Sequence, residues 1–241
     1  MNEITTILTV MDRIGYLESQ LKSIETQTIK SDIIIHWNSD EEYKLEYPSI
    51  IYRNQSKSAP LYNRFISSIN INTPYVFICD DDILPGKNYL ERCIEFSRKK
   101  NNNLCIVSYG MIFKEGETKY NVYQRINHKS NITKPTLVNM GGQGYFLPTK
   151  LLKHFNTSMI YEEYGEDIHL GYICWLNKIP TYVLDKDINN PYTWQDLTMG
   201  RRGSDSKAQW KYPTHKPIRS KLIKKYTELG WDFNLKGTDL I

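Results

Sequence analysis

Most of the structural information in this chain lies in one segment, Tyr75-Val76-Phe77-Ile78-Cys79-Asp80-Asp81-Asp82. Its first five residues form an uninterrupted apolar or weakly polar run, which is typical of a strand buried on both faces. The run ends at three consecutive carboxylates, and the turn signal Pro85-Gly86 follows. The segment therefore predicts a buried strand with an acidic turn at its carboxyl end.

The three acidic residues of that turn indicate a binding site. Adjacent carboxylates repel each other, and their removal from water is unfavourable unless positive charge neutralises them. A hard divalent cation that bridges carboxylates to substrate phosphates provides such a charge. The alternative is an acidic loop that caps the following helix. Because a cap needs only one Asp, we favour a metal site at the carboxyl end of the strand, where α/β sheets bind ligands.

The composition is typical of a globular protein. The 241 residues are 40% hydrophobic and 24% charged, which suits a domain with a substantial core. No apolar run reaches the length of a membrane span, and the first residues lack the basic segment of a signal peptide. The cysteines show no metal-ligand spacing, and we expect Cys79 and Cys105 to be buried thiols in apolar strands. These features predict a cytoplasmic protein.

The first half of the chain alternates between two hydrophobic periodicities. Runs rich in Ile, Val and Thr predict strands at 4–10, 32–37, 49–53, 75–80 and 104–109. Between them, helical spacing of apolar residues predicts helices at 16–26, 59–69 and 87–100. Strands that alternate with helices of this length predict an α/β fold with a mostly parallel central sheet and helices on both faces.

After residue 110 the pattern changes to a small antiparallel excursion. We expect strands at 120–126, 136–139 and 181–184, a flexible glycine-rich turn at 140–144, and helices at 149–155, 167–177 and 215–229. We interpret residues 1–200 as one domain. Residues 201–241 form a basic carboxyl-terminal extension, whose helix packs on the same domain.

The charge of that extension differs from that of the rest of the chain. It holds ten Lys or Arg residues and four acidic residues, whereas the whole chain has a net charge of only +4. A basic extension on a mildly acidic domain indicates an anionic partner, such as the DNA backbone. The alternative is a basic helix exposed to solvent, and charge alone does not distinguish the two.

A second acidic cluster, Glu166-Asp167, begins an almost wholly apolar helix after Gly165. Acidic residues in the first turn of a helix are stabilised by its dipole, which is the structural explanation. The functional explanation is that one of the two carboxylates faces a cleft and acts there as a general base. Taken alone, the pair favours neither.

Several further polar residues follow or precede the expected strands. Asp12 and Arg13 come after the first strand and Asn38 after the second, while Asn63 and Arg64 lie on the helix before the acidic strand. Guanidinium groups bind phosphates well, and an Asn amide can pair with a pyrimidine. The expected topology gathers these residues near the acidic turn.

Together these motifs resemble the GT-A class of nucleotide-sugar glycosyltransferases over about residues 4–190. The resemblance rests on Asp12-Arg13, Trp37-Asn38, Asn63-Arg64, the Asp-x-Asp motif Asp80-Asp81-Asp82, and Glu166-Asp167. In detail the set is similar to family 2 transferases and to exostosin-like N-acetylhexosaminyltransferases. Compact enzymes of this kind also occur in large DNA viruses and phages.

The resemblance implies roles for the acidic turn and the residues around it. Asp82 would bind Mn²⁺ or Mg²⁺, Asp80 would hold the ribose or a metal-bound water, and Asp81 would face the donor sugar. Arg13 and Asn38 would contact the uracil, and Arg64 the diphosphate or the sugar.

The resemblance also implies roles in the second half of the chain. Asp167 matches the catalytic acidic position, with Glu166 beside it. Gly142 belongs to the segment 141–144, which resembles a loop that lets the backbone approach the donor. Arg201 and Arg202 would lie on a loop that closes over the diphosphate. The usual pattern has a third metal ligand, for which His215 is the candidate.

We therefore expect a metal-dependent hexosyl- or N-acetylhexosaminyltransferase, which moves a sugar from a UDP-sugar to a hydroxyl of a glycan or of a modified DNA base. One alternative is a sugar nucleotidyltransferase, but the segment 9–15 lacks the glycine-rich phosphate loop of that class. Another is a non-catalytic module that binds nucleic acid or glycan through the basic extension. That alternative leaves the three Asp residues unexplained.

Overall fold

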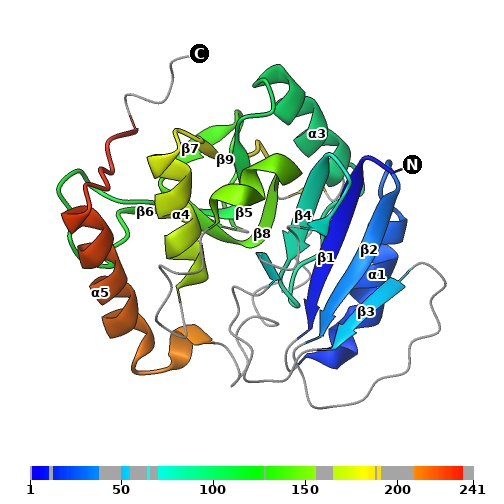
Figure 1. The fold of residues 1–241 in the computed structure, drawn as a ribbon, viewed down its shortest axis with the longest axis horizontal. Coiled ribbons are helices and arrows are strands. Elements are labelled where there is room, and N and C mark those ends of the chain that lie inside the picture. The colour runs from blue at the N-terminus through cyan, green and yellow to red at the C-terminus, as the bar shows by residue number, and fades with distance from the viewer. Residues whose placement is uncertain are drawn as a thin grey trace.

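A computed structural model describes residues 2–10, 13–37, 50–54, 64–65, 70–127, 129–155, 165–187, 189–190 and 209–235 of the chain. These residues form one sheet with helices on both of its faces (Figure 1). The sheet has the strand order β3-β2-β1-β4-β8-β5-β9-β7, and β6 pairs with β5. The expected α/β architecture is confirmed.

The first part of the sheet is parallel. Its strands are β1 (Ile4–Val10), β2 (Ser31–Trp37), β3 (Ile50–Asn54) and β4 (Tyr75–Cys79), and β1 pairs with both β2 and β4. All residues of β1 and β4 are buried, as expected for strands covered on both faces of the sheet. The short helix η1 (Ile14–Tyr16) and α1 (Leu17–Glu25) connect β1 to β2.

The second part of the sheet is largely antiparallel. Strand β8 (Met140–Pro148) lies between β4 and β5 (Cys105–Ile112) and is antiparallel to both. The short strands are β6 (Gln124–Ile126), β7 (Thr136–Val138) and β9 (Thr181–Val183), of which β9 runs parallel to β5. The strand expected at 120–126 is thus confined to its last three residues.

The prediction of a flexible turn at 140–144 was wrong, because this segment is the first half of β8. Its glycines allow strands to approach each other closely. A Cβ atom on Gly141 would lie 2.3 Å from the carbonyl oxygen of Tyr109, and one on Gly144 would lie 3.1 Å from the ring of Phe77. The absence of side chains at these positions serves strand packing rather than turn formation.

The two faces of the sheet are covered by different helices. On one face, Ile4 of β1 shares a core with Leu21 of α1 and Leu90 of α3 (Tyr89–Lys99). On the other face, Ile7 shares a core with Leu170 of α4 (Glu166–Leu176). The alternation of side chains along β1 therefore supplies both cores. The helix expected at 149–155 is the 3₁₀ helix η3 (Thr149–His154), which packs with the second core.

The last helix, α5 (His215–Glu228), follows the short helix η6 (Gln209–Lys211) and packs beside α4 (Figure 1). The ring of Tyr226 stacks on that of Tyr172 in α4, with 4.4 Å between their centroids. Gly165, just before α4, has a φ of +115°, and a Cβ atom there would lie 2.2 Å from Leu222 of α5. A glycine is therefore required for α4 to begin this close to α5.

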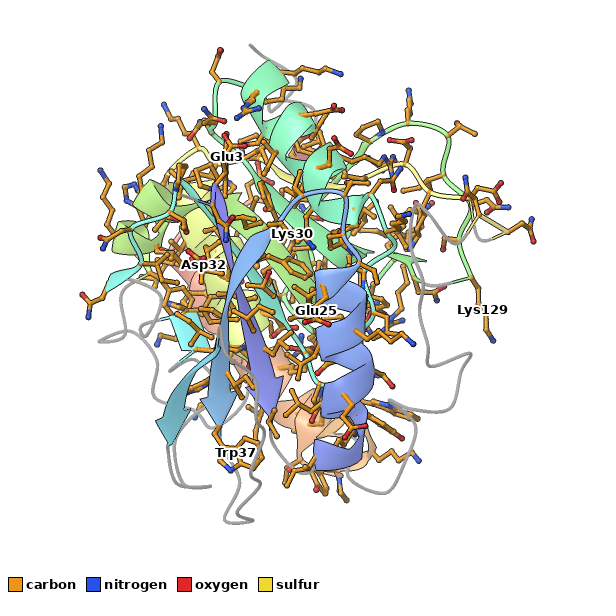
Figure 2. The ribbon with its side chains drawn as sticks, turned by 90° about the vertical axis from the view of Figure 1, so that its right-hand side faces the viewer. Glu3, Glu25, Lys30, Asp32, Trp37 and Lys129 are labelled. Carbon is orange, nitrogen blue, oxygen red and sulfur yellow. The ribbon has the colours of Figure 1, made fainter. Side chains whose placement is uncertain are left out.

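The carboxyl ends of the parallel strands and the amino ends of α4 and α5 point toward the same edge of the sheet, the lower edge in Figure 1. Figure 2 shows Trp37 at the carboxyl end of β2, far from Asp32 and Glu3 near the amino ends of β2 and β1. The acidic turn after β4 lies at this carboxyl edge, where the sequence places the candidate site.

The four cysteines are buried and form no disulfide, in agreement with the sequence. Among the described residues, no helix combines the length and apolar character needed to cross a membrane.

Candidate active site

The acidic turn after β4 is held by segments on both sides. The backbone N–H of Asp80 donates to the carbonyl of Gln143 in β8, at 2.7 Å. The side-chain amide of Gln20 in α1 donates to the carbonyls of Asp80 and Ile83, at 2.6 and 3.1 Å. Gln20 is buried, so these bonds are shielded from water. The turn is therefore fixed relative to the sheet.

Arg13 lies against this turn, as its position after β1 predicts. Its Nη1 atom is 2.6 Å from Oδ1 of Asp81 and 3.5 Å from Oδ2 of Asp82. The three side chains are only 10–13% exposed, so little water screens the pairs. The structure thus places Arg13 on two carboxylates of the Asp-x-Asp motif.

Arg64 is the central cation of the site. It is 3% exposed, pairs with Asp80, and lies 3.1 Å from Oε1 of Glu166. Its guanidinium also lies 5.4 Å from the ring centroid of Tyr145. Burial alone would lower the pKa of Arg64, but Asp80, Tyr145 and Glu166 together raise it. The side chain therefore stays charged and joins the acidic turn to the start of α4.

Glu166 and Asp167 occupy the first turn of α4, as expected, and their carboxylates have different partners. The Oε2 atom of Glu166 accepts the N–H of Gly165 at 3.2 Å. Burial, followed by the charge of Asp167, raises the pKa of Glu166, while Arg64 opposes that shift. The Oδ1 atom of Asp167 accepts the N–H of Ile168 at 2.8 Å.

The second oxygen of Asp167, Oδ2, binds Arg219 of α5 at 2.5 Å. Arg219 is buried, and its guanidinium lies 4.4 Å from the ring centroid of Tyr120. Burial alone would lower the pKa of Arg219, but Asp167 and Tyr120 raise it overall. In the sequence, Arg219 is one of the ten basic residues of the extension, and its place in the site was not predicted.

A signal for Arg219 is present in the sequence. The buried positions of α5 are Arg219, Leu222, Ile223 and Tyr226, the i, i+3, i+4, i+7 spacing of one helix face. An Arg in an otherwise apolar stripe needs a buried anionic partner.

His215 lies one turn before Arg219, and its ring is 6.1 Å from that of Tyr120. Burial, followed by the charge of Arg219, lowers the pKa of His215. Within the described ranges, no group of three or more His, Cys, Asp or Glu residues is arranged to hold a metal ion. The suggestion that His215 completes a metal site with the Asp residues stays a prediction.

Gly142 lies in β8 next to the acidic turn, and its carbonyl accepts the hydroxyl of Ser108 at 3.2 Å. A Cβ atom at this position would meet only the hydroxyl of Tyr145, at 3.6 Å. Gly142 thus belongs to a strand rather than to the expected loop. Asn38, Arg201 and Arg202, which were also assigned to donor binding, lie outside the described residues.

The site therefore collects oppositely charged side chains from the segments after β1 and β4, from α4 and α5, and from Arg64. The carboxylates outnumber the guanidinium groups that contact them. Among the described residues the carboxylates are Asp80, Asp81, Asp82, Glu166 and Asp167, and the guanidinium groups are Arg13, Arg64 and Arg219. This arrangement can bind a cation and an anionic ligand, and it can accept a proton.

Comparison with known structures supports the expected GT-A fold. The chain resembles the crystal structure of residues 1–349 of TarS from S. aureus, with a TM-score of 0.53 and 14% sequence identity. The likeness covers 77% of this chain and 58% of the TarS chain. At this level of identity it shows the fold alone, and the fold is the expected GT-A fold.

Comparison of sequences gives the family. No curated protein matches the chain. The model of the glycosyl transferase family 64 domain matches residues 4–131, more than half of the chain, and this range includes β1, Arg13, Arg64 and the acidic turn. The resemblance to glycosyltransferases is thereby confirmed, while the exostosin-like type and a viral source stay predictions. The chain belongs to the glycosyl transferase family 64 domain family.

Proposed function

We propose that the protein is a glycosyltransferase that moves a hexose or N-acetylhexosamine from a UDP-sugar to a hydroxyl acceptor, with Mn²⁺ or Mg²⁺ as cofactor. The observation that carries this proposal is the gathering of five carboxylates and three guanidinium groups at the carboxyl edge of the sheet. Ligands bind at this edge in α/β sheets. Membership of family 64 supports the transfer of a glycosyl group.

The side chains of the acidic turn fit a hard divalent cation. They offer only carboxylate oxygens, which Mn²⁺ and Mg²⁺ prefer, and the site has more negative than positive groups among the described residues. Asp82 and Asp80 would hold the ion, and the donor diphosphate would complete its ligands. When bound, such an ion stabilises the negative charge of the leaving diphosphate.

Two arginines serve the donor in different ways in this proposal. The side chain of Arg13 is 13% exposed, against 3% for Arg64, and would contact the uracil or the diphosphate. Arg64 is enclosed by Asp80, Glu166 and Tyr145. It would therefore hold the two carboxylates in position, and its positive charge would attract the anionic donor. Asn38, Arg201 and Arg202 remain candidates for donor contacts, and the backbone of Gly142 lies where a sugar can approach.

In this proposal, the two acidic residues of α4 have different roles toward the acceptor. Glu166 has a raised pKa because it is buried beside Asp167, and a base is most effective when its pKa approaches the working pH. Asp167 is held by Arg219 and by the N–H of Ile168. We assign proton acceptance from the acceptor hydroxyl to Glu166, and its orientation and electrostatic support to Asp167. The sequence alone had placed Asp167 first.

The test is a panel of nucleotide-sugars incubated with Mn²⁺, in which slow hydrolysis of the donor is measured without a known acceptor. Binding of UDP is measured in parallel by calorimetry. Asp82→Asn should abolish the Mn²⁺-dependent part of UDP binding and leave the melting temperature nearly unchanged, because the substitution removes charge but not volume. Asp32→Asn, at the opposite edge of the sheet (Figure 2), is the matched control. Unchanged Mn²⁺-dependent UDP affinity in Asp82→Asn would refute the metal assignment.

A further inference from the structure

Arg13 occupies the carboxylates that the proposed function gives to the cation and the donor. Its Nη1 atom is 2.6 Å from Asp81 and 3.5 Å from Asp82. A guanidinium group and a divalent cation compete for the same oxygens, because both are attracted by the same negative charge. The binding of a metal ion to Asp82 therefore has to change the contacts of Arg13.

The surroundings of Arg13 allow such a change, whereas those of Arg64 do not. The side chain of Arg64 is 3% exposed, pairs with two acidic residues of different elements, and also lies 3.4 Å from the hydroxyl of Thr9. The side chain of Arg13 is 13% exposed and lies at the rim of the site. Its carbonyl accepts the N–H of Tyr16 at 3.0 Å, which fixes the backbone at the start of η1. The long side chain can then turn by rotation about its own bonds, without movement of the backbone.

We propose that Arg13 is a resident counter-ion of the acidic turn and that it exchanges with the divalent cation. In the protein without metal, the guanidinium neutralises Asp81 and Asp82. When the cation takes the oxygens of Asp82, the guanidinium turns from the carboxylates to the anionic nucleotide. This inference rests on the proposed function, since it presupposes the metal site, and it adds that Arg13 couples metal binding to donor binding.

The exchange has two thermodynamic consequences. First, Arg13 weakens the binding of the metal alone, because its contact with Asp82 has to be broken. Second, the nucleotide strengthens metal binding, because the displaced guanidinium gains a new partner. By linkage, the metal strengthens nucleotide binding by the same factor. Without Arg13, metal and nucleotide would still meet through the phosphates, but this part of the coupling would be lost.

The experiment is calorimetric titration of the full chain with Mn²⁺ alone, UDP alone, and each in the presence of the other. We expect Arg13→Gln to bind Mn²⁺ alone more tightly than the unsubstituted protein, by roughly 5–150-fold, the usual size of such couplings. The factor by which UDP increases Mn²⁺ affinity should be smaller in Arg13→Gln by a similar ratio. Arg98→Gln is the matched control, because Arg98 forms an exposed ion pair with Glu3 at the opposite edge of the sheet (Figure 2).

A readout on the unsubstituted side chain covers the case in which Arg13→Gln does not fold. With ¹⁵N-labelled arginine, addition of Mg²⁺ without nucleotide should shift the Nε resonance of Arg13 and leave that of Arg98 unchanged. Arg13→Lys, which keeps the charge, serves to assign the resonance.

The possible results distinguish a failure of the exchange from a failure of the proposed metal dependence. Two results would overturn the exchange without affecting the proposed metal site. One is that Mn²⁺ binds the unsubstituted protein and Arg13→Gln with equal affinity and equal coupling to UDP. The other is that Mg²⁺ does not shift the resonance of Arg13. Weaker Mn²⁺ binding by Arg13→Gln would also overturn the exchange, because Arg13 would then support the metal rather than compete with it. If neither protein binds Mn²⁺, with or without UDP, the metal dependence of the proposed function is lost together with the exchange.

Discussion

The site has two halves that differ in how their carboxylates are neutralised. At the end of β4, Asp81 and Asp82 meet one arginine at the rim of the site. At the start of α4, Asp167 meets an arginine that is buried under Tyr120 and fixed by the packing of α5. We infer that the first half exchanges its cation and the second keeps it, since the side chain of Arg13 is 13% exposed and that of Arg219 is 7% exposed.

Arg64 joins the two halves, and its removal should have the largest effect. Arg64→Met leaves Asp80 and Glu166 without their shared cation in a buried environment. We expect a loss of about 3–5 kcal/mol in the free energy of unfolding, as for other buried ion pairs that lose one partner, together with loss of transfer. Denaturant unfolding checks the first expectation.

Two variants complete the Arg64 experiment. Arg98→Met removes an exposed arginine and should change stability by less than about 1 kcal/mol. Arg64→Met combined with Glu166→Gln should recover part of the lost stability, because one of the two unneutralised carboxylates is then removed. If the double variant is as unstable as the sum of the single ones, Arg64 contributes by packing rather than by pairing.

The second half of the site depends on Arg219, and its change should have an intermediate effect. Arg219→Gln keeps a hydrogen-bond donor near Asp167 but removes the charge. We expect a cost of about 1–3 kcal/mol in the free energy of unfolding, and transfer that falls much more than UDP affinity, since Arg219 contacts Asp167. Lys224→Gln is the control on the exposed face of α5. Equal losses in transfer and in UDP binding would place Arg219 in the donor site instead.

The two halves also differ in how far the sequence predicts them. The carboxylates are adjacent in the chain and follow a recognisable strand or Gly, so Asp80, Asp82 and Glu166 were identified from local pattern. Their cations come from distant segments, with Arg13 68 residues from Asp81, Arg64 102 residues from Glu166, and Arg219 52 residues from Asp167. Arg13 and Arg64 were found because they lie next to expected elements of the same sheet. Arg219 was missed because its place depends on how α5 packs on α4.

The strands of the sheet also differ in how well the sequence predicts them. Strands β1 and β4 were predicted nearly to the residue, because a buried parallel strand is a continuous apolar run. Strand β8 was mistaken for a turn, because its glycines carry the local signal of a loop. Only the neighbouring strands explain them, since Tyr109 and Phe77 leave no space for a side chain at Gly141 and Gly144.

The smallest expected effect concerns the pH dependence of transfer, and it distinguishes the roles of Glu166 and Asp167. A base must be deprotonated, so activity should fall as the pH falls through the pKa of Glu166, which burial and Asp167 raise from its ordinary value. Asp167→Asn removes that neighbouring negative charge and keeps an oxygen for Arg219. The pKa of Glu166 should then decrease, and the acidic limb of the profile of kcat/KM should move to lower pH.

The opposite assignment gives a different result for the same variant. If Asp167 itself accepts the proton, Asp167→Asn lowers transfer by roughly 10²–10⁴-fold at every pH, and Glu166→Gln is the milder change. If Glu166 is the base, Glu166→Gln shows that loss, while Asp167→Asn retains most of the activity with a displaced acidic limb. Both variants keep the size of the side chain at the start of α4, and equal melting temperatures would confirm that the comparison is one of chemistry. A full loss in both would mean that the two carboxylates act as one coupled unit, as their adjacency and the effect of the Asp167 charge on the pKa of Glu166 allow.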